Sequence, residues 1–191
     1  MRRALNIAML VAIGLLTVGA LVGVILGVTT HKEPVFMHPG KSWDSTPLGV
    51  ACTGYVESRE SDCEVVEGVI DRINTRLGFR AYRLSDGVDP SVTITIGVPS
   101  EQGWIDPGGD AELSWQGDRF LSCRVRTSNT GTSELLFLTL HHELGHCLDL
   151  AHDDYEQSIM RPVQRPTPDQ TMPPWISDAD RAALRGLYGA D

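Results

Sequence analysis

Three histidines in the segment HHELGHCLDLAHD (141–153) constrain the fold more than any other feature of the chain. His142 and His146 are four residues apart, so on an α-helix they lie about 40° apart around the axis and one turn apart along it. Their rings could therefore bind one metal ion from a single helix face. His152 comes six residues later, where a continuous helix would place it ~240° around the axis and ~9 Å away. It can join the other two only if the helix ends near Leu148 and the chain reverses.

This reversal needs a residue that tolerates a positive φ angle, and Asp149 stands at the expected position. Aspartate enters the left-handed region more readily than most residues, although less readily than glycine. Three histidine ligands leave one coordination position of a zinc ion for water or substrate, as in catalytic sites. Glu143 follows the first ligand, where its carboxylate can take a proton from a water molecule that the metal activates. We therefore predict a catalytic zinc site with His142, His146 and His152 as ligands and Glu143 as general base.

Two neighbours of the ligands are interpreted differently. His141 points ~100° away from His142 on a helix, which indicates packing or support of a ligand and not metal binding. Cys147 also faces away from the ligands, which favours a disulfide or burial.

The N-terminal residues 1–30 predict a membrane anchor that is not removed. Arg2 and Arg3 precede an apolar run at 4–28, and 25 helical residues span ~37 Å, enough to cross a hydrocarbon core of ~30 Å. The alternative is a cleavable signal peptide, which would leave a secreted protein. The basic pair places the N-terminus in the cytoplasm and the remainder of the chain outside.

Glycines in the anchor suggest a second alternative, homodimerisation. Gly19, Gly23 and Gly27 form two overlapping GxxxG steps, which allow two membrane helices to approach closely. Glycine is common in membrane helices, so these steps also have an interpretation without a dimer.

The four cysteines, Cys52, Cys63, Cys123 and Cys147, lie in the part expected outside the cytoplasm, where thiols tend to oxidise. Two disulfides are expected, and of the three pairings we favour Cys52–Cys63 with Cys123–Cys147. A cysteine-ligated zinc is the alternative, and the absence of a C-x2-C spacing disfavours it. The formal net charge of −9 disfavours binding to nucleic acid and says little about a peptide partner.

Residues 31–47 contain three prolines without a regular period, which predicts a stalk. Residues 48–191 predict one α/β domain with a mixed sheet, because strand-like and helix-like segments alternate. Ser61 and Glu64 have capping-box spacing and Gly78 suits a helix end. The predicted strands are 48–56, 91–98, 111–115 and 119–126, and the predicted helices are 61–78, 133–148 and 177–189.

The segment HELGHCLDLAH (142–152) resembles the zinc signature HExxHxxGxxH of the metzincin metallopeptidases, and SIMRP (158–162) resembles the methionine-bearing turn of their matrixin branch. The resemblance places Met160 beneath the metal. It implies a metzincin-like zincin domain with a mostly parallel sheet, a long active-site helix and a C-terminal helix. PGGDAEL (107–113) is similar to the matrixin segment before the edge strand, and WISDADRAALRGLYG (175–189) is similar to the C-terminal helix.

Two departures from the matrixin pattern concern Asp149 and Glu112. Asp149 replaces the glycine of the signature, and Glu112 stands where matrixins often have a histidine that binds structural zinc. The second departure disfavours a second zinc ion and leaves calcium binding through Asp110 open. Tyr155 does not match the tyrosine that the family uses near its metal.

Together these features predict a membrane-anchored, extracytoplasmic zinc metalloendopeptidase. A peptide or protein substrate would add antiparallel to the strand 111–115. The loop 162–174 would border the pocket that receives the first side chain after the cleaved peptide bond. The rival classes are a zinc-binding scaffold protein that has lost turnover and a hydrolase of non-protein amides.

Overall fold

The computed structural model describes residues 36–55, 61–85, 87, 89–99, 108–128, 132–153, 158–162 and 176–189. The expected anchor at 4–28 and its GxxxG steps lie outside these residues. Within the described ranges, none of the helices combines the length and apolar character needed to span a bilayer.

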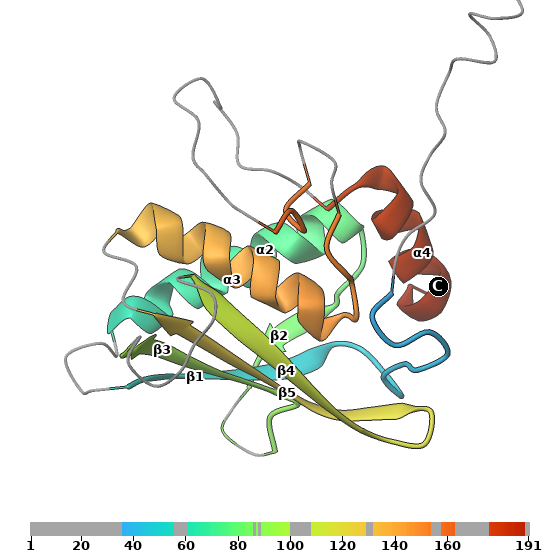
Figure 1. Cartoon of the computed structure of the whole chain (residues 1–191), viewed down its shortest axis with the longest axis horizontal. Helices are drawn as coiled ribbons and strands as arrows, with labels where there is room; N and C mark the ends of the chain where they lie inside the picture. The colour runs from blue at the N-terminus through green and yellow to red at the C-terminus, as the bar shows by residue number, and fades with distance from the viewer. Residues whose placement is uncertain are drawn as a thin grey trace, which may run out of the picture. The chain divides into compact units, whose positions relative to one another are not determined.

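The described residues form a mixed five-stranded sheet and three helices (Figure 1). The elements in chain order are β1 (Leu48–Gly54), α2 (Glu64–Leu77), β2 (Tyr82–Leu84), β3 (Val92–Val98), β4 (Gly109–Gln116), β5 (Arg119–Ser128), α3 (Ser133–Cys147) and α4 (Asp178–Tyr188). The spatial order is β2-β1-β3-β5-β4. Only β4, at one edge, runs antiparallel to its described neighbour, so the sheet is mixed and mostly parallel, as predicted.

One face of the sheet is apolar and is covered by α2 and α3 (Figure 1). In β3 the side chains of Val92, Ile94, Ile96 and Val98 alternate with more exposed residues, so one face of the strand is buried. The core between sheet and helices encloses fully buried large side chains. This two-layer arrangement is the usual solution for a sheet with one apolar face.

Helices α2 and α3 differ in how much of their surface is buried. The apolar side chains of α2 recur on one face: Val66, Val69, Ile70, Ile73 and Leu77. Helix α3 is buried on nearly all sides from Leu136 to Cys147, with Thr132 as its N-cap. Gly78 ends α2 at φ 75°, the left-handed conformation that glycine adopts without a Cβ penalty.

The structure differs from the sequence predictions at three places. Residues 61–63 form a 3₁₀ turn and α2 begins at Glu64, so Ser61 is not the helix cap. The short strand β2 was not predicted, because three residues carry too little periodicity. Residues 36–47, predicted as part of a stalk, pack on the domain: the Trp43 indole is buried and the backbone N of Phe120 donates to Ser42 O.

Candidate metal centre

Helix α3 places His142 and His146 side by side, and the loop after it carries His152 back toward them. The Nε2 atom of His142 lies 3.0 Å from Nε2 of His146 and 3.2 Å from Nε2 of His152. All three potential ligand atoms lie within 4.8 Å of one another. His142 and His146 are buried while His152 is exposed, so the site opens to solvent on the side of His152.

The chain reversal depends on Asp149, whose φ is 71°. The backbone N of Asp149 donates to His146 O at 2.8 Å, and Leu148 N and Leu150 N both donate to Gly145 O. The helix thus ends within one turn after His146, and the left-handed residue redirects the chain. Asp149 thus adopts the positive φ angle that the spacing of the histidines predicted.

Backbone carbonyls fix the orientation of two imidazole rings. Nδ1 of His142 lies 2.6 Å from Ile159 O, and Nδ1 of His146 lies 2.7 Å from Leu150 O. A carbonyl oxygen only accepts, so each Nδ1 carries the proton and each Nε2 presents a lone pair. Such backbone acceptors are typical partners of metal-binding histidines.

The Nε2 lone pairs of the histidines face one another, and this arrangement shows whether a metal ion fits between them. Two unprotonated nitrogens 3.0 Å apart repel unless a proton or a cation lies between them. Burial, reinforced by the neighbouring His142, lowers the pKa of His146 to about 4, so this ring is neutral at pH 7. A tetrahedral zinc ion with Zn–N bonds of about 2.05 Å needs nitrogens about 3.3 Å apart. The spacing and donor chemistry of His142, His146 and His152 therefore fit zinc.

Met160 has a fully buried side chain that packs against α3 at Gly145. A Cβ atom built on Gly145 would collide with the Met160 sulfur. Glycine at this position of α3 thus lets the methionine pack directly against the helix backbone. The Met160 carbonyl accepts from Asp153 N at 2.8 Å, which links the methionine turn to the residue after His152.

Glu143 is 4 % exposed on α3, next to the ligand His142. Gly109, at the start of the edge strand β4, packs against it, since a Cβ on Gly109 would lie 3.3 Å from Glu143 Cγ and 2.9 Å from Thr139 Cγ2. The Glu143 side chain therefore packs against the start of the edge strand, and the residue follows His142 directly in the chain.

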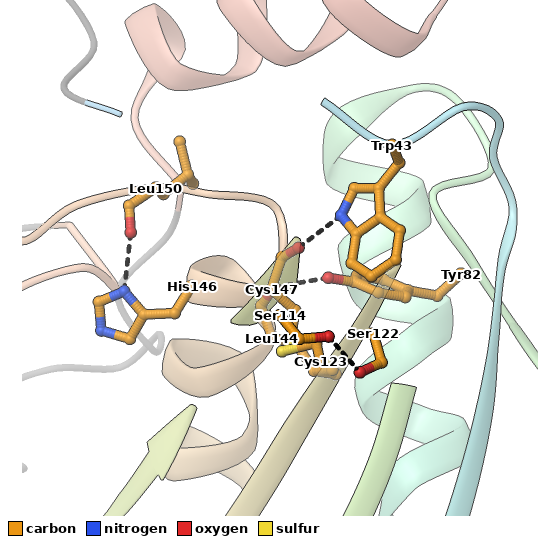
Figure 2. The surroundings of a disulfide bond; sticks show 9 residues. All are labelled: Trp43, Tyr82, Ser114, Ser122, Cys123, Leu144, His146, Cys147 and Leu150. Carbon is orange, nitrogen blue, oxygen red and sulfur yellow. Dashed lines mark hydrogen bonds between the residues drawn. A yellow bond between two sulfur atoms is a disulfide. The ribbon is translucent and has the colours of Figure 1, made fainter. Parts of the chain in front are cut away.

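The last turn of α3 is held by side chains from distant parts of the chain (Figure 2). Trp43 Nε1 donates to Cys147 O at 2.8 Å, and the Tyr82 hydroxyl donates to Leu144 O at 2.5 Å. The four final carbonyls of a helix lack intrahelical donors, and here Leu144 to Cys147 all find partners. Neither Trp43 nor Tyr82 was identified from the sequence, because nothing local indicates a contact across 104 or 62 residues.

Both favoured disulfides are present in the structure. Cys52 bonds to Cys63, and Cys123 bonds to Cys147, which joins β5 to the last residue of α3 (Figure 2). The pairing removes all four cysteines from metal binding. His141 is also separate from the metal: Nδ1 contacts Phe137 O at 3.0 Å, and burial lowers the pKa of the ring to about 4.

Two further residues that were considered from the sequence, Asp110 and Glu112, lie on β4. Asp110 contacts the Arg126 guanidinium with both carboxylate oxygens, at 3.2 and 2.5 Å, so an arginine already neutralises the carboxylate considered for calcium. Glu112 lies opposite Arg124, with 3.5 Å between charged atoms. Tyr155 and residues 163–175 lie outside the described part of the chain.

A buried helix, a reversed loop and a methionine turn that converge on three imidazoles define a zinc metallopeptidase type of domain. Residues 96–189 match the sequence model of the family described as matrixin, and the cluster of three histidines is consistent with a matrixin-like metzincin domain. A comparison with curated proteins finds no match.

Proposed function

We propose that the chain is an endopeptidase that cleaves peptide bonds with a zinc ion held by His142, His146 and His152. The observation that carries the proposal is the convergence of three Nε2 atoms beside the buried Glu143. When bound, zinc supplies a Lewis acid that acidifies water and polarises a carbonyl group. Glu143 accepts the proton of the attacking water and then donates it to the leaving amine.

The edge strand β4 supports a peptide as substrate. It pairs with β5 on one side, and no described strand pairs with its other side. An extended peptide adds to such an edge through main-chain hydrogen bonds. The contact of Gly109 with the Glu143 side chain supports a substrate position near the proposed general base. These contacts favour a peptide over a non-protein amide.

The rival function is a zinc-binding scaffold without turnover, which Asp149 suggested at the level of sequence. Asp149 adopts the conformation that a glycine would, so this substitution leaves the ligand set intact. The buried Glu143 has no role in a purely structural zinc site, which further favours the enzyme.

We further propose that the domain faces an oxidising compartment outside the cytoplasm and is tethered by residues 4–28. Two disulfides support the compartment, and the apolar run after Arg2 and Arg3 supports the tether. Alkaline extraction of membranes, followed by protease digestion from the outer side, tests both statements. Release of the chain by alkali, or protection of the domain, would contradict them.

The test of the catalytic proposal replaces Glu143 with Gln, which preserves volume and removes the base. Cleavage of a quenched peptide library should fall by about 10²–10⁴-fold while zinc content stays at one ion per chain. Glu134→Gln on the exposed first turn of α3 is the matched control and should cleave like the parent. Cleavage by the Glu143 variant at the parent rate would remove this residue from the mechanism.

A further inference from the structure

Residues 36–38 lie against the loop that follows α3. The backbone N of Met37 donates to Asp149 O at 2.9 Å, and Phe36 forms an antiparallel bridge with Leu150. The backbone N of His38 donates to the Asp149 carboxylate, 3.1 and 3.2 Å from its two oxygens. Nδ1 of His38 lies 2.7 Å from Oδ1 of Asp149. One short segment thus contacts both the main chain and the side chain of the loop.

The carboxylate of Asp149 explains why aspartate is useful at a position that glycine would occupy with less strain. The residue is 1 % exposed and has a φ of 71°. Burial raises the pKa of this carboxyl group, and the hydrogen bonds from His38 oppose that effect. A buried carboxylate requires such donors, and glycine would offer His38 nothing to bind.

Asp149 and Leu150 connect two zinc ligands. Asp149 N donates to His146 O, and Leu150 O is the acceptor that orients the His146 ring. The third ligand, His152, follows two residues after Leu150. A segment that holds Asp149 and Leu150 from outside therefore fixes the path of the chain from the second ligand to the third.

His38 also contacts the β4–β5 hairpin. Its ring centroid lies 4.5 Å from the ring of Trp115 on β4 and 5.9 Å from the ring of Phe120 on β5. The imidazole thus lies between the metal-binding loop and the hairpin that includes the edge strand. This position resists movement of the loop relative to the sheet.

We propose that Asp149 is a positioning residue which, through His38, attaches residues 36–38 to the metal-binding loop and thereby sets the zinc affinity of the three-histidine site. The inference rests on the zinc-binding part of the proposed function and is independent of peptide cleavage. It assigns the N-terminal segment a role in metal retention, although His38 is 104 residues from the first ligand.

The test uses the full chain and measures zinc dissociation constants by competition with a chelator. Asp149→Asn and His38→Phe should each weaken zinc binding about tenfold, the lower end of the effect of residues that support metal ligands. Phenylalanine retains an aromatic ring against Trp115 and Phe120 but lacks Nδ1. Asp149→Gly should weaken binding at least as much, although glycine relieves the strain of a positive φ.

The matched control is Asp44→Asn, which weakens the exposed ion pair between Asp44 and Arg119 at another point of the N-terminal segment. It should change zinc affinity by less than twofold. The double variant His38→Phe/Asp149→Asn should bind about as weakly as either single variant, because both changes act on the same contact between His38 Nδ1 and the Asp149 side chain.

A cobalt spectrum distinguishes positioning from general destabilisation. At saturating cobalt, the visible absorption of Asp149→Asn should differ from that of the parent, because the ligand geometry changes. A variant that is only less stable gives the parental spectrum once it is loaded. Parental zinc affinity in His38→Phe, tighter binding in Asp149→Gly, or a parental cobalt spectrum in Asp149→Asn would each overturn the proposal.

The two proposals fail in different ways. If the parent binds zinc and cleaves peptides but His38→Phe retains full affinity, only the positioning role is wrong. If the parent binds zinc and the variants lose affinity while no peptide is cleaved, only the peptidase proposal is wrong. If the parent binds no zinc at neutral pH, both are wrong.

Discussion

Helices α2 and α3 are nearly equal in length, and each is joined to the sheet by one disulfide and contains one internal glycine. Helix α2 is amphipathic, and its glycine, Gly68, has open space around it. Helix α3 is buried on nearly all sides, and its glycine presses on Met160. The difference shows that the same local features stabilise one helix and shape a candidate metal site in the other.

The largest expected difference between the helices comes from acid. Buried residues of α2 are all aliphatic, whereas α3 buries His141 and His146, whose pKa values are lowered to about 4 mainly by burial. Below pH 6.5 the unfolded chain binds more protons than the folded chain, so stability is lost as the pH falls from 6.5 toward 4. In the metal-free protein, His141 and His146 should each lower the free energy of unfolding by about 2 kcal/mol at pH 5.

Urea unfolding at pH 7 and pH 5, with a chelator present, measures this loss. His141→Phe should remove about half of it. Equal stability of the parent at both pH values would show that the buried histidines do not distinguish α3 from α2.

Removal of the two disulfides separates stability from metal binding. The closed loops have sequence separations of 11 and 24, so each bond should contribute about 3 kcal/mol by the chain-entropy estimate. Replacement of both members of either pair by Ala should therefore lower the free energy of unfolding by similar amounts. Only the Cys123/Cys147 variant should also lose zinc affinity, about tenfold, because Cys147 follows the ligand His146. A comparable loss in the Cys52/Cys63 variant would contradict the separation.

A glycine-to-alanine substitution should change the free energy of unfolding in opposite directions in the two helices. Gly145→Ala pushes the new methyl group into Met160 and should destabilise by about 1–3 kcal/mol, as overpacking does. Gly68→Ala meets no neighbour and should stabilise α2 by about 0.5–1 kcal/mol, because alanine has the higher helix propensity. Thermal unfolding of the two variants measures both effects. A stabilising Gly145→Ala would mean that Met160 can move aside without cost.

The smallest expected effect concerns the end of α3. Trp43→Phe keeps an aromatic ring but leaves Cys147 O without its indole donor, which should cost about 1–2 kcal/mol. The end of α2 is closed by Gly78 N, which donates to Asn74 O within the same helix turn, and needs no distant partner. Chemical denaturation of Trp43→Phe measures the effect, and unchanged stability would show that solvent replaces the indole.

The sequence predicted what depends on local spacing. The ligand spacing predicted the helix end and the reversal at Asp149, and alternation predicted the buried face of β3. The pairing of the cysteines was favoured correctly among three alternatives. These features follow from the geometry of a single helix or strand, or from a short list of combinations.

Long-range contacts escaped prediction for a physical reason. The segment 36–47 has no period because its residues are held singly, by Asp149, by Cys147 O and by the β4–β5 hairpin. Hydrogen bonds of this kind join groups more than 70 residues apart, and no local pattern encodes them. The 3₁₀ turn before α2 likewise replaced a cap that the spacing of Ser61 and Glu64 had suggested.

Gly109 limits how the gap between β4 and α3 can evolve. Its hydrogen faces Thr139 and Glu143, and a methyl group there would also lie 2.9 Å from Arg126 O. Every substitution at this position adds atoms, so the space between Gly109 and the Glu143 side chain can only be narrowed there, never widened. A larger residue at this position therefore requires a displacement of Thr139, of Glu143 or of the strand itself.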